Sequence, residues 1–229
     1  LHWTEIGWVN LYGKRPLKLP ADTRGQRVRA SSSIASQAFL REIGADTITM
    51  PFSDVLPSLQ TGLIDAGVTS VTMYALSGIP SEAPYYLLTR HTYDMGVLIA
   101  NDRWFEGLTP REQEVYAQGL GGAAATRRAA RDSVATLMKA LPAQGVTLYD
   151  PTPEERATWR RAAWPAHEKL IRQIGGQARR IYETLLEGKA AWKSAQSADP
   201  SAAAAAVAAV AAGAPAASAR TAGTASASH

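Results

Sequence analysis

The chain has 229 residues, a formal net charge of +4 and a sequence pI near 9.4. This length predicts one or two domains with a sizeable core. The basic residues are spread along the chain and not interleaved with aromatic residues in one stripe, which argues against nucleic acid as a partner. The chain contains no cysteine, so disulfides, zinc–thiolate sites and thiol catalysis are excluded. No apolar run is long enough to span a membrane.

The first residue is Leu1 and not methionine, and no signal peptide is recognisable. We therefore expect the sequence to be a fragment or a processed product. The absence of cysteine does not fix the compartment by itself.

The first half of the chain alternates strand-like and helix-like runs. The patterns predict a buried strand over 6–11, a break at 13–16, a turn at 22–25, and further strands over 27–30, 47–50 and 66–70. Helical spacing of apolar residues predicts helices over 34–43, 53–62 and 71–76. A longer apolar run over 93–100 predicts another strand, buried on both faces if the sheet is parallel. This rhythm predicts an α/β fold with a mainly parallel sheet flanked by helices.

The second half of the chain is predicted to be helical. Capping boxes at 109–112 and 152–155 each place proline at the first helical position. A short strand is expected over 146–149, an interruption at Pro165, and a continuous helix from His167 to about Leu186. After Ala198 the composition changes to alanine, serine, glycine and threonine, which predicts a disordered tail. A lipid-facing helix is the less favoured interpretation, since alanine is only weakly apolar.

The residue of greatest functional interest is Arg29, at the end of the strand over 27–30. Three serines follow it and open a helix, and a helix N-terminus and a guanidinium both favour a carboxylate. One interpretation is an ordinary ion pair or a solvated strand end. The other is a bidentate clamp for a ligand carboxylate, a task for which arginine suits better than lysine. Because ligands of open α/β sheets bind beyond the carboxyl ends of strands, we expect Phe52, Thr69 and Ser70 to lie near Arg29.

Several aromatic residues also allow two interpretations, either core and hinge packing or an apolar wall of a ligand pocket. They are Trp3, Trp8, Tyr12, Tyr74 and Tyr93, of which we select Trp8 and Tyr93 as ligand-binding candidates. The basic residues Arg127, Arg128 and Arg131 are interpreted as the solvated face of a helix.

Known catalytic and metal-binding patterns are absent from the sequence. The four histidines make no metal-binding pair, and no phosphate loop or Gly-x-Ser-x-Gly elbow occurs. We expect no metal, no cofactor and no enzymatic activity. One enzymatic alternative stays open, a hydrolase that uses Ser32 or Ser33 with His91.

Five motifs, by their order and spacing along the chain, resemble those of the solute-binding proteins of tripartite ATP-independent periplasmic (TRAP) transporters, the DctP family. The family's Lys-Arg-Pro-Leu hinge segment corresponds to Lys14–Leu17. Its Asp-Leu-Lys-Gly-x-Lys-Ile-Arg segment corresponds to Asp22–Arg29, and its Met-Pro-Phe…Leu-Gln-x-Gly…Asp-Gly segment to Met50–Ala66. The stretches Trp3–Trp8 and Trp104–Pro110 also resemble family segments. The resemblance extends from Leu1 to about Glu187.

The resemblance implies a periplasmic-binding-protein-like second lobe and a function in transport. It assigns residues 1–20 to hinge strands and a connector, 21–108 to the ligand-binding lobe, 109–198 to a C-terminal helical segment and 199–229 to the tail. It implies a periplasmic protein that captures a small organic acid through Arg29 and delivers it to membrane permease subunits. Family members often place a ligand-contacting asparagine where this chain has Thr69, and they carry a first lobe that precedes Leu1. A non-catalytic interaction domain stays open as an alternative.

Overall fold

The computed structural model describes residues 2–119, 122–198 and 205. The described chain divides into two compact units, one up to Ala166 and one from His167 onward. Within the described residues the strands are β1 (His2–Gly13), β2 (Arg27–Ala30), β3 (Asp46–Thr49), β4 (Ala66–Ser70), β5 (Tyr85–Leu98) and β6 (Thr147–Tyr149). The α-helices are α1 (Ile34–Glu42), α2 (Val55–Gln60), α3 (Val71–Ala75), α4 (Ile79–Glu82), α5 (Asp102–Glu106), α6 (Pro110–Gln118), α7 (Gly122–Ala140), α8 (Pro153–Ala163), α9 (Pro165–Ile174) and α10 (Ala178–Ala198).

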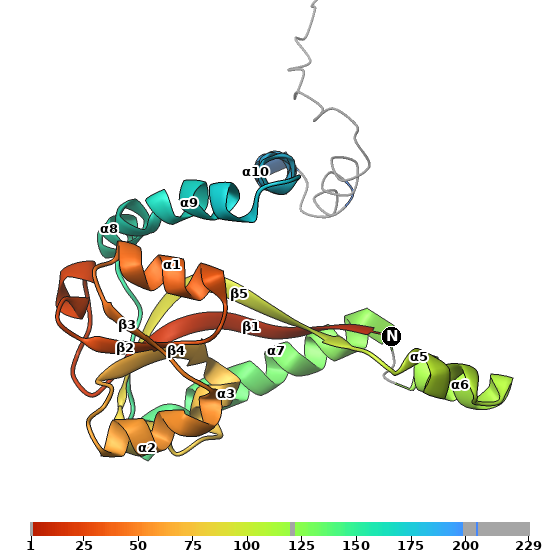
Figure 1. Ribbon diagram of the computed structural model, residues 1–229, viewed down its shortest axis with the longest axis horizontal. Coiled ribbons are helices and arrows are strands. Elements are labelled where there is room, and N and C mark those ends of the chain that lie inside the picture. Colours follow the sequence, from red (N-terminus) through yellow and green to blue (C-terminus); the bar gives the residue numbers. More distant parts are fainter. Residues whose placement is uncertain (1, 120–121, 199–204, 206–229) are drawn as a thin grey trace, which may run out of the picture. The chain divides into compact units, whose positions relative to one another are not determined.

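The first unit is built on one mixed sheet with strand order β3-β2-β4-β1-β5-β6 (Figure 1). Strand β2 pairs in parallel with β3 and β4, and β5 pairs in parallel with β6. Strand β1 runs antiparallel to both β4 and β5. The predicted α/β class is confirmed, and its parallel part is the β2-α1-β3-α2-β4 segment expected from the alternation of strands and helices.

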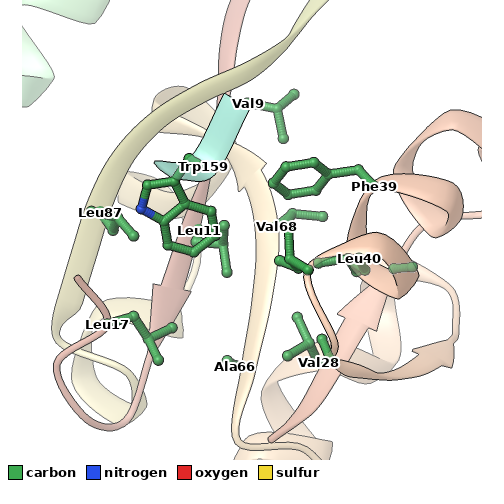
Figure 2. Close-up of a cluster of buried hydrophobic side chains, with 13 residues drawn as sticks. Val9, Leu11, Leu17, Val28, Phe39, Leu40, Ala66, Val68, Leu87 and Trp159 are labelled. Carbon is green, nitrogen blue, oxygen red and sulfur yellow. The ribbon is translucent and has the colours of Figure 1, made fainter. Parts of the chain in front are cut away.

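Helices cover both faces of this sheet. One buried cluster joins the strands to α1 and α8, with Phe39, Leu40 and Trp159 packed on Leu11, Val28 and Leu87 (Figure 2). The indole nitrogen of Trp159 donates to the carbonyl of Lys18 at 2.8 Å, which ties α8 to the connector after β1.

A second buried cluster lies on the opposite face of the sheet and involves α2, α3 and α4, with partly buried residues of α7. Its largest members are Tyr12, Tyr74 and Tyr86, and the ring centroids of Tyr74 and Tyr86 lie 4.4 Å apart. These two faces follow from the alternation of side chains along each strand.

Strands β1 and β5 extend beyond the sheet as a two-stranded ribbon. Strand β1 pairs with β4 only from Val9 to Gly13, and its earlier residues pair with β5 alone. The ribbon is largely exposed, and Trp8 is 47% exposed. Two expectations are therefore wrong: residues 6–8 are not part of a buried strand, and 93–98 are not buried on both faces. The fully buried part of β5 is 86–89, ahead of the run that the sequence singled out.

Local signals at helix ends are confirmed. Thr109 and Thr152 both close capping boxes, with Glu112 and Glu155 respectively. Gly44, which follows the C-cap residue Ile43 of α1, has a φ of +84°, in the left-handed region that favours glycine. The predicted short strand over 146–149 is present as β6.

The second unit contains most of α9 and all of α10. These helices are separated at Gly175 and Gly176, which have φ values of +66° and +53°. The expected continuous helix from His167 to Leu186 is therefore wrong, because two successive left-handed glycines end α9. Within this unit the Arg179 guanidinium pairs with the Glu168 carboxylate at 2.7 Å. The predicted tail after Ala198 lies outside the described residues, apart from Ala205.

Candidate functional site

Arg29 occupies the penultimate position of β2 and is only 6% exposed. Its Nε and Nη2 atoms both donate to the carbonyl of Met50, at 3.2 and 3.0 Å. The guanidinium carbon lies 5.7 Å from the centre of the Phe52 ring, a cation–π distance. Met50 and Phe52, which follow β3, thus contact the guanidinium, and the Met50 carbonyl binds its Nε–Nη2 edge. The Nη1 atom makes no hydrogen bond to the described part of the chain.

No carboxylate of the described residues neutralises this buried guanidinium. Among the ion pairs of the described residues, the neighbouring Arg27 pairs with Asp65 at 2.9 Å, whereas Arg29 pairs with no acidic residue. Burial accordingly lowers the pKa of Arg29 from its usual value, while the Arg27 guanidinium holds the pKa of Asp65 below its usual range. A buried charge without a counter-ion is costly.

Thr69 and Ser70 end β4, the strand next to β2, and both are buried. The Thr69 carbonyl accepts a hydrogen bond from the Tyr86 hydroxyl at 3.1 Å. The Ser70 hydroxyl accepts from the amide of Met73 and so forms the N-cap of α3. The Ser70 side chain therefore has a structural role as a helix cap.

Trp8 and Tyr93 lie together on the β1–β5 ribbon, with ring centroids 4.7 Å apart in an edge-to-face arrangement. Both line a cavity of about 420 Å³ between the ribbon and α7. Its other lining residues include Asn10, Val71, Leu88, Arg90, Val134 and Met138. The structure thus brings Arg29 together with Phe52, and Trp8 together with Tyr93, but Arg29, Phe52, Thr69 and Ser70 do not line this cavity.

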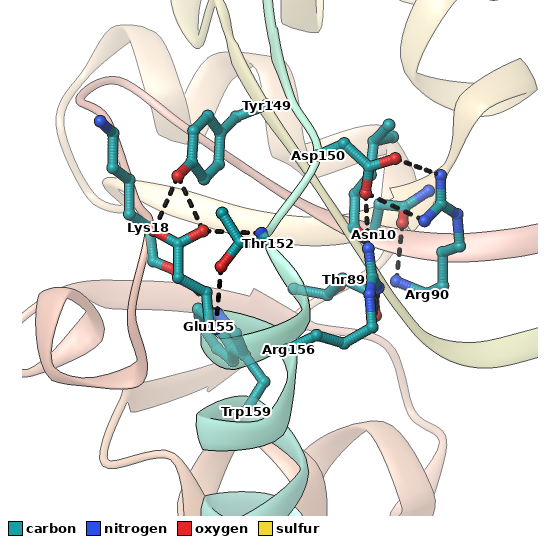
Figure 3. A network of polar contacts seen from close by, with 11 residues as sticks. Asn10, Lys18, Thr89, Arg90, Tyr149, Asp150, Thr152, Glu155, Arg156 and Trp159 are labelled. Atoms are coloured by element: carbon teal, nitrogen blue, oxygen red, sulfur yellow. Dashed lines mark hydrogen bonds and ion pairs between the residues drawn. The ribbon is translucent and has the colours of Figure 1, made fainter.

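Asn10, which sequence reasoning does not single out, is a buried amide that also lines this cavity. Its Nδ2 donates to the Tyr86 hydroxyl at 3.3 Å and to the Trp8 carbonyl at 3.2 Å. Its Oδ1 accepts from the backbone amide of Arg90 at 2.9 Å (Figure 3). Arg90 has a φ of +48° and lies in a bulge where residues 88–91 of β5 face Asn10 alone.

A charged cluster of Arg90, Asp150 and Arg156 also stabilises the bulge. The Arg90 guanidinium binds both oxygens of Asp150, at 3.0 and 2.9 Å, and Asp150 also pairs with Arg156 (Figure 3). Arg156 donates to the carbonyls of Leu88 and Thr89 at 3.2 and 3.3 Å. The two arginines hold the pKa of the Asp150 carboxyl below its usual range.

The serine–histidine pair required for a hydrolase is not formed. The Ser33 hydroxyl caps α1 by accepting from the amide of Ser36. Nδ1 of His91 lies 2.7 Å from the Thr89 hydroxyl, and its ring stacks on Phe39 with centroids 3.9 Å apart. Nε2 of His91 is buried without a partner, and this burial lowers the pKa of His91 to about 3. Neither ring nitrogen of His91 has a hydrogen bond to Ser32 or Ser33, and the low pKa makes this imidazole a weak base.

Arg127 and Arg131, which the sequence predicts to lie on a solvated helix face, share a specific partner, Glu5. Nε and Nη2 of Arg131 donate to the Glu5 carboxylate at 3.0–3.1 Å, and Arg127 lies 3.8 Å from it. Both arginines are exposed, but the Glu5 side chain beneath them is only 9% exposed. They therefore fix α7 to the ribbon. The described residues contain no cluster suited to a metal ion, and none of the described helices is long and apolar enough to cross a membrane.

Comparison with known proteins gives a consistent result. Residues 1–173 match the model of the bacterial extracellular solute-binding protein family 7, DctP. The C4-dicarboxylate-binding periplasmic protein DctP of Rhodobacter capsulatus is 26% identical over 188 residues, which cover 77% of this chain and 54% of that protein. The 2,3-diketo-L-gulonate-binding periplasmic protein YiaO of Escherichia coli is 31% identical over 115 residues, covering 50% of this chain and 35% of that protein.

Solved structures agree with these relatives. The sugar acid binding protein DctPAm of Advenella mimigardefordensis, in complex with galactonate, matches with a TM-score of 0.71 and 26% identity over 77% of this chain and 58% of that one. These two DctP proteins match most of this chain, but the match covers little more than half of their own length. The family match over 1–173 shows that this chain belongs to the bacterial extracellular solute-binding proteins of family 7, the DctP family.

Proposed function

We propose that this chain is the second lobe, with hinge strands and C-terminal helices, of a periplasmic solute-binding protein that serves a TRAP-type transporter. Its ligand is a small organic acid whose carboxylate is bound by Arg29. The observation that carries the proposal is a guanidinium that is 6% exposed and has no acidic partner among the described residues. Relatives named for C4-dicarboxylates and sugar acids support a carboxylate ligand.

The geometry at Arg29 favours one mode of binding. Since the Met50 carbonyl occupies the Nε–Nη2 edge, the end of the guanidinium that carries Nη1 and Nη2 is directed to the ligand. Two parallel N–H···O bonds from this end match the spacing of a carboxylate. Phe52 provides the apolar side of the site, and Thr69 provides a polar contact where other family members place asparagine. Ser70, Trp8 and Tyr93 complete the proposed contact set, with Trp8 and Tyr93 on the ribbon.

The exposed ribbon fits a protein with a further lobe. Ribbon residues that are apolar and exposed include Trp3, Ile6, Trp8, Met95, Val97 and Leu98. A first lobe packed on this surface would enclose the ligand by hinge closure and exclude water from the ion pair. In this division residues 1–20 form the hinge and connector, 21–108 the ligand-binding lobe and 109–198 the helical segment. Membrane permease subunits then receive the ligand, and no covalent chemistry is involved.

The proposal is tested by calorimetry on the full-length gene product, with galactonate, β-D-galacturonate and succinate as probes. Arg29→Ala is expected to weaken binding of the preferred acid by more than about thirtyfold, because a buried charge-assisted contact is lost. Arg27→Ala is the matched control, since Arg27 lies two residues away on the same strand and already pairs with Asp65. Unchanged affinity of Arg29→Ala, or an equal loss in both variants, would contradict the assignment.

A further inference from the structure

The strand register places Tyr12 in one row with Arg29. Arg29 on β2 pairs with Gly67 on β4, and Gly67 pairs with Tyr12 on β1. Residues that pair directly across strands point to the same face of a sheet, so the side chains of Arg29 and Tyr12 share a face, with a glycine between them. This face is the one covered by α2, α3 and α4.

The glycine in the middle of the row is required by the phenol of Tyr12. A Cβ atom added to Gly67 would lie 2.1 Å from the Tyr12 oxygen and 2.4 Å from the ring carbon that carries it. The Tyr12 ring therefore crosses from β1 over β4, and its hydroxyl occupies the place of the missing side chain. This position brings the hydroxyl to the strand next to Arg29.

The Tyr12 hydroxyl lacks a partner in the part of the chain that the structure describes. It is buried and makes no hydrogen bond to any described residue. The other two tyrosines of the cluster are satisfied, since Tyr74 donates to the Ala83 carbonyl at 2.8 Å and Tyr86 donates to the Thr69 carbonyl at 3.1 Å. Burial raises the pKa of Tyr12, so the group stays a neutral O–H donor. An unmet donor in a buried site is costly, and the guanidinium of Arg29, whose Nη1 makes no hydrogen bond to the described residues, is near enough to act electrostatically on this hydroxyl.

One external acceptor satisfies both groups. A carboxylate carries two oxygens with several lone-pair directions, so it can accept from the guanidinium and from a hydroxyl at once. We infer that Tyr12 is a further ligand-positioning residue, whose hydroxyl donates to the carboxylate bound at Arg29. This inference rests on the proposed function of Arg29. It adds a donor that sets the orientation of the carboxylate plane.

The inference predicts opposite effects of Tyr12→Phe on affinity and on stability. In the full-length gene product, calorimetry with galactonate and β-D-galacturonate should show an affinity about ten- to a hundredfold lower, the loss expected for a hydrogen bond to a charged group. The melting temperature of the ligand-free variant should rise, because the deleted hydroxyl had no partner. A merely structural hydroxyl would not raise stability while lowering affinity.

Tyr74→Phe is the matched control in the same cluster. It deletes a hydroxyl that has a partner, so it should lower the melting temperature and leave the affinity unchanged. Wild-type affinity in Tyr12→Phe, or a lower melting temperature in that variant, would overturn the inference and leave the proposed role of Arg29 intact. If the wild-type protein binds no carboxylate at all, both the proposed function and the inference are wrong.

Discussion

Replacement of Asn10 by leucine tests the link between the sheet and the ribbon. Asn10 is 1% exposed, and its side chain makes three hydrogen bonds, at 2.9, 3.2 and 3.3 Å, to Arg90, Trp8 and Tyr86. Asn10→Leu keeps a similar volume but deletes all three. The most serious loss is the acceptor for the Arg90 amide, because the Arg90 backbone has a positive φ within the bulge.

The expected cost follows from these contacts. A net contribution of about 1 kcal/mol for each hydrogen bond gives about 3 kcal/mol, of which the apolar leucine recovers roughly 1 kcal/mol. We therefore expect the free energy of unfolding to fall by about 2 kcal/mol. Urea denaturation followed by circular dichroism measures this change through the transition midpoint.

Asn101→Ala is the control for loss of an asparagine contact. Asn101 is exposed and accepts one hydrogen bond as the N-cap of α5, so its replacement should cost about 1 kcal/mol. If Asn10→Leu costs no more than Asn101→Ala, the argument that Asn10 holds the bulge is refuted.

Three further predictions concern the packing of the first unit. The pKa of His91 is about 3 in the folded protein and near 6.5 when unfolded, so stability is complete above about pH 6.5 and falls as the pH decreases toward 3. His91→Phe keeps the stack on Phe39 and should remove a loss of about 1–2 kcal/mol between pH 7 and pH 5; an unchanged pH profile of urea midpoints would contradict this. Gly67→Ala should destabilise the protein by about 1–3 kcal/mol through its collision with Tyr12, and wild-type stability would show that the ring has room to move. Trp159→Ala should cost about 3–5 kcal/mol in a denaturant titration, because it empties a buried position and deletes the bond to Lys18; a loss below 1 kcal/mol would mean that α8 contributes little to the core.

The parts of the fold that were predictable from sequence are those with local signals. The segment β2-α1-β3-α2-β4 has short strands and amphipathic helices in strict alternation, and the helix caps at Thr109 and Thr152 are marked by their own residues. The expectation for 93–100 is wrong because an apolar run of this kind is compatible with burial on both faces. This part of β5 pairs with β1 alone, some 90 residues earlier in the sequence, and it is exposed because the two strands extend beyond the sheet as a ribbon.

In the candidate site, too, only the residues with a local sequence signal could be selected. Arg29 and Phe52 could be placed together because Arg29 lies at the end of one strand of the parallel segment and Phe52 follows the neighbouring strand. Asn10 and Tyr12 could not be selected, because their roles depend on partners distant in sequence: Arg90 for one and Gly67 for the other. The pairing of Arg131 with Glu5 depends in the same way on α7 lying against β1. A glycine in a strand is a weak signal of close approach, but it does not identify the side chain that fills the space.

The most direct test of the central claim is a crystal structure of the full-length gene product with galactonate, or with whichever acid calorimetry finds to bind most tightly. The account predicts that the carboxylate lies within hydrogen-bond distance of the Arg29 guanidinium, on the edge away from the Met50 carbonyl. A ligand bound with its carboxylate remote from Arg29, while Arg29 keeps no anionic partner, would contradict it.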